Sequence, residues 1–198
     1  MNEKNTTNVK RLTQIGMLSA IAVVLMLFEF ALPFAPSFYE LDFSEVPVLV
    51  GCFAMGPSAG VAIELVKVLL NLLINGSLTA GVGEFANFAI GCAFCVPAGL
   101  IYRSKRTKKG AIWGMASGTL FMTVAGGFIN AYIMLPTYAK AFGWPLEDLV
   151  SMGTKINPAI DDLTTFILYA VVPFNLLKGI LVSFVVALIY KKIRVILK

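Results

Sequence analysis

A run of six residues near the end of the chain, Pro173–Lys178 (PFNLLK), places an amide and an ammonium group among apolar side chains. On a helix, Asn175 and Lys178 are three positions apart and share one face. If this helix lies in a membrane, inserting the charged lysine costs about 2.5–3.5 kcal/mol, so the residue needs a partner or a function. We therefore expect Lys178 to bind a ligand or to pair with a carboxylate from another helix.

Two more amides occupy apolar stretches of the chain. Asn87 lies three positions after Glu84, and Asn130 precedes Tyr132 by two positions. Glu84 has three open interpretations: the counter-ion of Lys178, a ligand contact, or an acid favoured in the first turn of a helix by the helix dipole. Asn130 is expected to face the interior of a helical bundle, where its amide hydrogen-bonds either a neighbouring helix or a ligand.

A fourth polar group comprises Glu64, Lys67, Asn71 and Asn75, whose spacings of 3, 4 and 4 place them on one helical face. Glu64 and Lys67 have opposite charges and can neutralise each other. This pattern favours a structural polar seam against a neighbouring helix, and a binding site is the alternative.

Several catalytic chemistries are excluded by residues that the chain lacks. It contains no histidine, which excludes Ser-His dyads, H-E-x-x-H zinc sites and histidine proton relays. It contains no Walker A or G-x-G-x-x-G motif and no cluster of metal ligands. Asp161 and Asp162 are adjacent in a loop and not on facing spans, which argues against an intramembrane aspartyl protease. Cys52, Cys92 and Cys95 lie in apolar runs and are expected to be small packing residues. The sequence therefore predicts a binding or transport protein, without enzymatic activity, metal or cofactor.

The composition indicates that these polar residues lie in a membrane. Of 198 residues, 58% are hydrophobic and only 14% are charged, and the mean hydropathy is +0.83. A soluble protein of 21.4 kDa cannot bury so much apolar surface. The formal net charge is +5, but the basic residues do not alternate with aromatics on a polar face, so nucleic-acid binding is not expected. Residues 1–198 are predicted to form one multi-pass domain in the lipid bilayer.

Three clusters of basic residues predict the orientation. They lie before residue 12, between residues 103 and 109, and after residue 190. The positive-inside rule places all three in the cytoplasm. The apolar blocks that they delimit cover residues 12–35, 45–75, 80–102, 111–137 and 163–190.

Five single crossings cannot place all three clusters on the same side. The second block must cross twice, and Gly56-Pro57 near its middle interrupts a helix because proline lacks the N–H that continues it. The predicted fold is thus an all-α membrane protein, a single bundle of six transmembrane helices with both termini in the cytoplasm. Its outer loops contain acids and aromatics, and a long loop of this kind is often a lid or a binding loop. The two short spans cover residues 45–56 and 58–74, and the outer loops cover residues 34–44, 75–82 and 137–163.

Two stripes of small residues predict close helix packing. Gly16 and Ala20 lie four positions apart in the first block, and Gly110, Gly114 and Gly118 repeat this spacing near the start of the fourth. Such faces let helix backbones approach closely. The spacing leaves open whether the partner helix is internal or belongs to another protein.

Four segments make the chain similar to a known family. They are LDFSEVP at 41–47, Gly56-Pro57 with Gly60, EFANF at 84–88 and PFNLLKG at 173–179. Together they resemble the substrate-binding S components of energy-coupling factor (ECF) transporters, and most of all the riboflavin-specific members. The resemblance covers essentially the whole chain, and the last segment is its most specific part.

This resemblance implies a high-affinity vitamin site that opens to the outside of a bacterial plasma membrane. Riboflavin would be the transported substrate, delivered inward with a transmembrane T component and two ATPase subunits. Gly16 and Ala20 would form the helix face that docks the T component. Carried over by position, the ligand-binding residues are Glu40, Leu41, Asp42, Asn87, Asn130, Asn175 and Lys178, and Glu84 joins them as a candidate beside Asn87.

Three alternatives stay open from the sequence. The chain could be an S component for another vitamin, a self-sufficient ion-coupled carrier that uses Glu64 and Lys67 as a charge relay, or a structural subunit. A carrier would drive uptake without ATPase partners, although the single small domain shows no clear internal repeats. In a structural subunit, replacing Lys178 would lower stability without any ligand affinity to lose.

Overall fold

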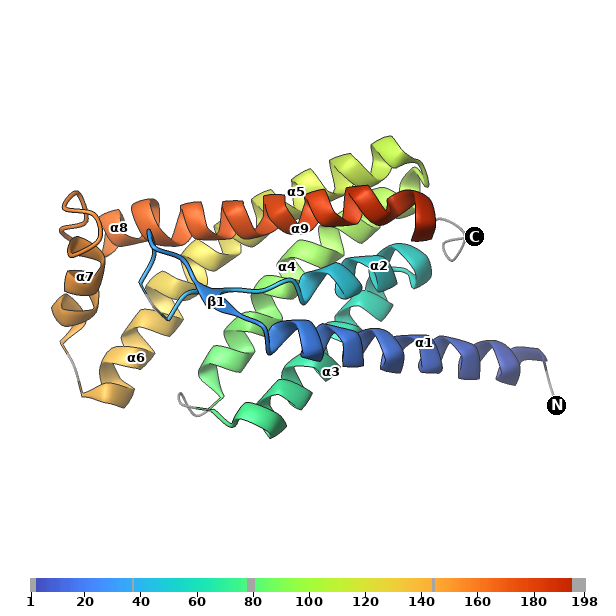
Figure 1. Cartoon of the computed structure of the whole chain (residues 1–198), viewed down its shortest axis with the longest axis horizontal. Helices are drawn as coiled ribbons and strands as arrows, with labels where there is room; N and C mark the ends of the chain where they lie inside the picture. Colours follow the sequence, from blue (N-terminus) through green and yellow to red (C-terminus); the bar gives the residue numbers. More distant parts are fainter. Residues whose placement is uncertain (1–2, 37, 78–80, 144, 194–198) are drawn as a thin grey trace.

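The computed structural model describes residues 3–36, 38–77, 81–143 and 145–193. Within these residues the chain is mostly helical, with a single pair of two-residue strands and connecting turns. The long helices run roughly along one axis and form an elongated bundle (Figure 1). The predicted all-α class is therefore confirmed, apart from the minor strand pair.

The helices follow one another with short connections. Two π-helical turns, η1 (Asn130–Met134) and η2 (Ile167–Val171), join α5 to α6 and α8 to α9. In the described part of the chain, five helical segments are long and apolar enough to cross a membrane, and α2 is a shorter apolar helix. The helices are α1 (Glu3–Met26), α2 (Glu45–Met55), α3 (Pro57–Asn75), α4 (Val82–Ser104), α5 (Lys108–Ile129), α6 (Leu135–Phe142), α7 (Leu146–Thr154), α8 (Leu163–Phe166) and α9 (Val172–Ile193).

The predicted break in the second apolar block lies at Gly56, between the end of α2 and the start of α3. Gly56 has φ +96°, a conformation that residues with a side chain rarely adopt. Pro57 occupies the first position of α3, where a missing N–H breaks no helical hydrogen bond. The chain therefore turns back here, and the two helices pack against each other.

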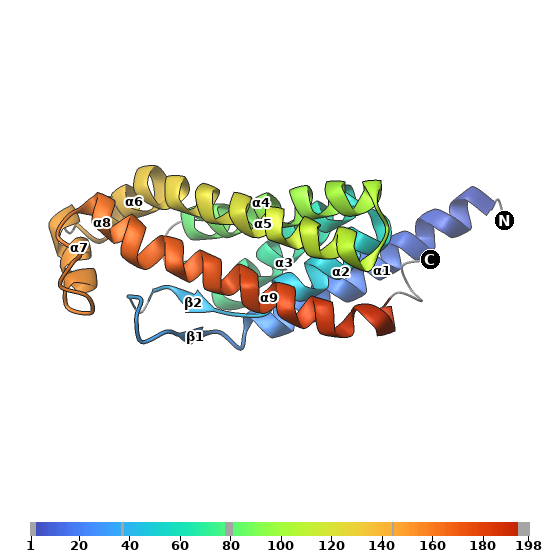
Figure 2. The same ribbon diagram turned by 90° about the horizontal axis from the view of Figure 1, so that it is seen from above.

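The segment between α1 and α2 is extended. β1 (Phe30–Ala31) pairs antiparallel with β2 (Glu40–Leu41), a ribbon that the sequence did not predict. Figure 2 shows this ribbon beside α9, on the side away from α5 and α6. Because α2 contains only 11 residues, about 16 Å of helix, the extended chain supplies the rest of this passage through the bundle. Extended backbone at membrane depth is tolerated where it is buried in protein or lines a cavity.

The last outer loop, predicted over residues 137–163, is mostly helical, so the expectation of a long loop is wrong. It contains the end of α6 and the whole of α7. These helices cover the end of the bundle opposite the start of α1 (Figure 1). This segment is helical because α7 buries one face against α6 and α8, and together they form a shared apolar core. The core includes Leu135, Leu149, Ile160 and Phe166.

The glycine stripe of α5 packs against α4. A β-carbon at Gly114 would lie 2.6 Å from the carbonyl oxygen of Ala98, and one at Gly118 would clash with the carbonyl of Phe94. The partner of this stripe is therefore an internal helix. By contrast, Gly16 and Ala20 on α1 are both exposed.

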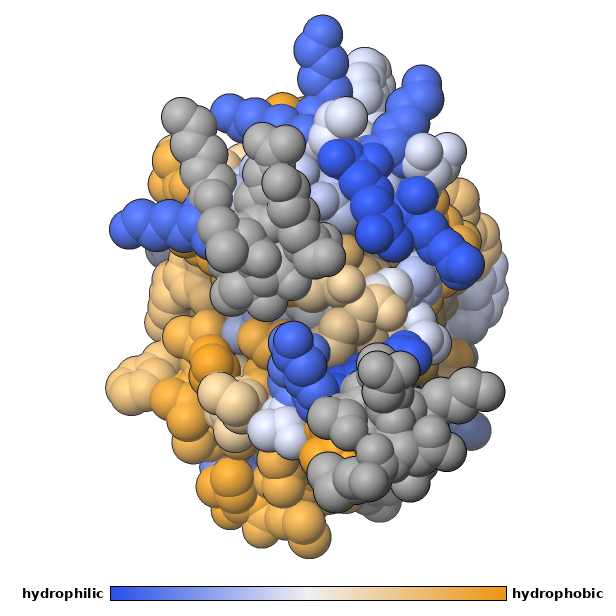
Figure 3. All heavy atoms as spheres, turned by 90° about the vertical axis from the view of Figure 1, so that its right-hand side faces the viewer, coloured by the Kyte–Doolittle hydropathy of each residue, from blue (hydrophilic) through white to orange (hydrophobic). Residues whose placement is uncertain are grey.

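The start of α1 and the end of α9 lie at the same end of the bundle (Figure 1). The turn between α4 and α5 is also at this end, and its basic residues from Arg103 to Lys109 are exposed. Figure 3 faces this end and shows hydrophilic side chains gathered over its upper part. Arg11 on α1 donates a hydrogen bond of 2.8 Å to Ser58 at the start of α3. Basic residues from two of the three clusters thus share one end of the molecule, as the charge pattern predicts.

Candidate functional site

A cavity of about 210 Å³ opens between the extended segment before α2 and the helices α4, α5, α6 and α9. A second hollow of about 530 Å³ adjoins it. Together they form one cleft of the size typical for small-molecule sites, about 300–1,000 Å³. The two hollows share the lining residues Glu29, Phe38, Glu40, Gly83, Asn87 and Tyr138.

Lys178 forms an ion pair at the wall of this cavity. Its Nζ lies 2.7 Å from Oδ2 of Asp42, and the Ser44 backbone N–H donates to Oδ1 of Asp42 at 2.6 Å. The carboxylate partner of Lys178 is Asp42, so the interpretation of Glu84 as its counter-ion is wrong. The lysine side chain is 12% exposed and lines the cavity, so its other N–H groups can reach a ligand.

Asn130 and Asn175 bring amides to the cavity from two helices. Asn130 is the first residue of η1; it donates to the Gly126 carbonyl at 2.8 Å and accepts from the Tyr39 hydroxyl at 2.7 Å. Asn175 lies on α9 just after η2 and donates to the Val171 carbonyl at 2.9 Å. Both amides are buried and line the cavity. π-Helical turns are frequent at functional sites, and here one lies beside each amide.

The other predicted side chains divide between the cavity and its surroundings. Glu40 and Asn87 line the cavity. Leu41 is absent from the lining because successive side chains of a strand point to opposite faces, and it packs into an apolar cluster with Ala35 and Phe174. Glu84 lines the adjoining hollow, where it accepts a hydrogen bond of 2.9 Å from Ser77. Six of the eight predicted side chains therefore meet at one cavity.

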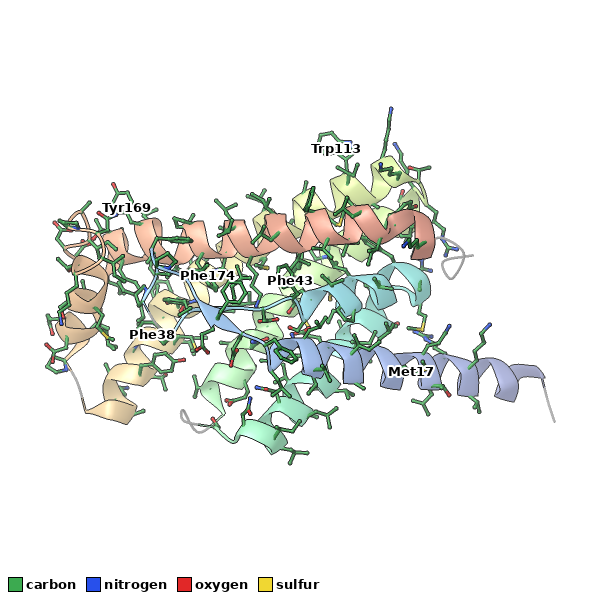
Figure 4. All side chains as sticks on the ribbon, viewed as in Figure 1. Met17, Phe38, Phe43, Trp113, Tyr169 and Phe174 are labelled. Atoms are coloured by element: carbon green, nitrogen blue, oxygen red, sulfur yellow. The ribbon has the colours of Figure 1, made fainter. Side chains whose placement is uncertain are left out.

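Aromatic side chains form a wall of the cavity, and the sequence reasoning did not assign them individually. Phe38 lies edge-on to Tyr138 with ring centroids 6.0 Å apart, and the rings of Tyr39 and Phe174 are 5.4 Å apart. Figure 4 shows Phe38 and Phe174 inside the bundle, whereas Trp113 points away from it. The one feature of the sequence that could have indicated this wall is the density of aromatic residues in the predicted first outer loop.

Glu29 is a second residue of the site that the sequence reasoning did not identify. It follows α1 and, together with Glu40, lines both hollows. Glu29 as a whole is exposed, but partial burial of its carboxyl raises its pKa to about 7, and the charges of Glu40 and Asp42 and a hydrogen bond to Glu40 act in the same direction. Glu29 can therefore hold a proton close to neutral pH. Its sequence neighbours are apolar, so only the folded chain brings the other carboxylates to it.

Lys67 anchors a second buried group, which we call the Lys67 cluster (Glu45, Glu64 and Lys67). Its Nζ lies 2.8 Å from Oε1 of Glu45 and 2.7 Å from Oε1 of Glu64, and it donates to the Ser44 hydroxyl at 3.3 Å. The predicted pairing of Glu64 with Lys67 is confirmed. Glu45 from α2 is a member that the sequence reasoning missed, and it makes the cluster a link between α2 and α3.

The helical bundle, its apolar outer surface and its polar cavity define a membrane protein built to hold a small ligand. Residues 10–190 match the family model described as ECF transporter, substrate-specific component. The chain therefore belongs to the substrate-specific components of ECF transporters. Members of this family are transport proteins, which confirms the expectation that the chain is not an enzyme.

Curated relatives are similar over nearly their whole length. The chain is 39% identical over 201 residues to the riboflavin transporter RibU of Staphylococcus aureus, covering 100% of this chain and 99% of the relative. It is 35% identical to the riboflavin transporter FmnP of Bacillus subtilis, covering 94% and 93% respectively. A solved structure of the S component of a bacterial ECF transporter matches with a TM-score of 0.75 and 38% identity, covering 96% of this chain and 99% of that one. The similarity therefore extends to the fold as well as the sequence.

Proposed function

We propose that this chain is the riboflavin-binding S component of an ECF vitamin transporter and that it captures riboflavin in the cavity described above. The observation that best supports this proposal is that one cavity combines the Lys178–Asp42 pair, two buried amides and an aromatic wall. The pyrimidine edge of riboflavin offers donors and acceptors that suit Lys178, Asn130 and Asn175, and its tricyclic ring suits the aromatic wall. The riboflavin transporters among the relatives support this choice of ligand.

In this proposal the chain makes six passes through the bacterial plasma membrane. The sixth pass is α2 together with the extended segment before it. The basic end of the bundle faces the cytoplasm by the positive-inside rule, which leaves both termini inside and the cavity near the outer surface. The exposed face at Gly16 and Ala20 is then available to the T component. Two ATPase subunits would supply the energy for uptake, since this chain contains no Walker A motif.

A binding titration tests the ligand. The full chain, purified in detergent micelles, should quench the fluorescence of added riboflavin in a saturable way and leave thiamine unbound. Preparations that retain ligand should show the absorption of a flavin. A protein that is folded by circular dichroism but does not quench riboflavin fluorescence would contradict the proposal.

An uptake assay separates an S component from a self-sufficient carrier. Proteoliposomes that contain this chain alone should not accumulate riboflavin under an ion gradient, whereas addition of the T component, the ATPases and ATP should permit uptake. The structure offers little support for a charge relay, because Glu64 and Lys67 are fully buried and bind each other. Gradient-driven uptake by the chain alone would establish the carrier instead.

A further inference from the structure

Glu45 lies at the cavity wall, and one of its buried carboxylate oxygens has no donor among the described residues. The residue begins α2, and its side chain is only 3% exposed. Oε1 is held by Lys67 at 2.8 Å, whereas Oε2 has no hydrogen-bond partner among the described residues. Glu45 is also part of the cavity lining. A buried, charged residue of the cavity wall therefore has one acceptor oxygen without a donor among the described residues.

The other carboxylate of the Lys67 cluster provides a comparison within the same molecule. Oε1 of Glu64 lies 2.7 Å from Nζ of Lys67 as an ion pair, the residue is fully buried, and neither of its carboxylate oxygens has a hydrogen-bond partner among the described residues. It packs against Gly91, and a β-carbon there would clash with its carboxylate. Unlike Glu45, Glu64 does not belong to the cavity lining. Only one of the two carboxylates that Lys67 holds can therefore meet a ligand.

Two other buried acceptors of the cavity, Asp42 and Asn130, already have donors. Asp42 receives Lys178 on one oxygen and the Ser44 N–H on the other. Asn130 receives the Tyr39 hydroxyl on its amide oxygen. Leaving a buried charged acceptor without a donor is costly, so a ligand that supplies one gains binding energy there. Lys67 keeps the carboxylate in place, which lowers the entropic cost of that contact.

We propose that Glu45 is a ligand-binding residue that reads a hydrogen-bond donor of the bound flavin through Oε2. Riboflavin has two kinds of donor, the N3–H of its ring and the hydroxyls of its ribityl chain, and both suit a carboxylate acceptor. This assignment rests on the proposed function and adds a residue that selects for a donor-bearing ligand. Lys67 acts here as a positioning residue, because it contacts Glu45 rather than the cavity.

The test compares Glu45→Gln with the matched control Glu64→Gln, using the full chain in detergent micelles. Both variants remove one negative charge from the same lysine, and only the first alters the cavity. We expect Glu45→Gln to weaken riboflavin binding about 10- to 100-fold, the range for a hydrogen bond to a charged group, and Glu64→Gln to change it less than about 3-fold. Glu45→Asp is a second variant, which keeps the charge opposite Lys67 but withdraws the acceptor, and it should also weaken binding.

Two riboflavin analogues identify the donor. Lumiflavin keeps the ring N3–H but lacks the ribityl chain, and 3-methylriboflavin keeps the chain but lacks the N3–H. The analogue without the contacted donor should bind wild type and Glu45→Gln equally well, because the contact is already lost. Equality with either analogue supports the assignment and names the donor. If Glu45→Gln weakens the binding of both analogues as much as it weakens the binding of riboflavin, the assignment is overturned. It is also overturned if Glu45→Gln binds riboflavin with wild-type affinity.

The same titrations separate this assignment from the proposed function. A folded wild-type chain that binds no riboflavin overturns both. A wild-type chain that binds riboflavin, with Glu45→Gln and Glu45→Asp binding it equally well, overturns the assignment of Glu45 alone.

Discussion

Lys178 and Lys67 both place an ammonium group beside carboxylates inside the bundle, yet their surroundings differ. Lys178 pairs with Asp42 and keeps part of its side chain open to the cavity. Lys67 is fully buried, donates hydrogen bonds to Glu45 and Ser44, and forms an ion pair with Glu64. The first pair joins α9 to the extended segment, and the second joins α3 to α2. A buried charge in this protein can therefore serve a ligand or the fold, and the deciding feature is whether the charged group keeps donors free for the cavity.

The largest expected effect comes from removing the fully enclosed lysine. Lys67→Met leaves Glu45 and Glu64 buried side by side without their cation. Removing one partner of a buried ion pair typically costs about 3–5 kcal/mol. We expect the free energy of unfolding in mixed micelles to fall by that amount. The triple variant that adds Glu45→Gln and Glu64→Gln should recover much of the loss, and an unfolding free energy unchanged in Lys67→Met would contradict the structural role.

Replacing Lys178, which lines the cavity, should lower ligand affinity more than it lowers stability. In Lys178→Met, Asp42 keeps the Ser44 N–H, so the loss of stability should be smaller than in Lys67→Met. Riboflavin affinity should fall about 10- to 100-fold, since a charged donor in the cavity is lost. Fluorescence titration measures the affinity, and Lys155→Met, which removes an exposed lysine of α7's C-terminal end, is the control. A Lys178→Met protein that binds riboflavin like the wild type would remove the distinction between the two lysines.

Charge placement and helix chemistry made much of the fold predictable from the sequence. The break at Gly56 was predictable because proline and a positive φ are local properties of the chain. The polar residues Asn87, Asn130, Asn175 and Lys178 stood out because an apolar background leaves few reasons for such side chains. Their convergence on one cavity follows from the helical arrangement. The structure leaves their role in ligand binding as a prediction.

The parts that could not be predicted depend on contacts distant in sequence. Asp42 is 136 positions from Lys178, and no local pattern selects it over Glu84 as the partner. The extended segment and its strand pair are stabilised by packing beside α9, so their short apolar sequence looks like a helix end or a loop. The π-helical turn at Asn130 adds a residue without a recognisable motif. In the sequence, Glu45 is an acid in the first turn of a helix, and only the packing of α3 against α2 brings Lys67 to it.

A glycine substitution can displace a cavity amide without removing a charge. A β-carbon at Gly126 would lie 2.8 Å from Nδ2 of Asn175, so Gly126→Ala forces that amide to move. We expect riboflavin affinity to fall about 3- to 10-fold and stability to fall by about 1–3 kcal/mol from overpacking. Gly127→Ala is the matched control, because its β-carbon would make an ordinary 3.5 Å contact with Ile167. Equal affinities in the two variants would show that the position of Asn175 does not matter for binding.

The smallest expected effect is a dependence of stability on pH that comes from Glu29, a carboxyl at the cavity. The pKa of Glu29 is about 7 in the folded chain, above its ordinary value of 4.5, so the native state binds more protons than the unfolded state between these pH values. Stability should therefore decrease as the pH rises from 4.5 to 7. After allowance for solvent screening, we expect the melting temperature to decline by about 1–3 °C between pH 4.5 and 7 relative to Glu29→Gln. Glu147→Gln, which alters an exposed acid on α7, should keep the wild-type slope, and a wild-type slope in Glu29→Gln would assign the proton to another group.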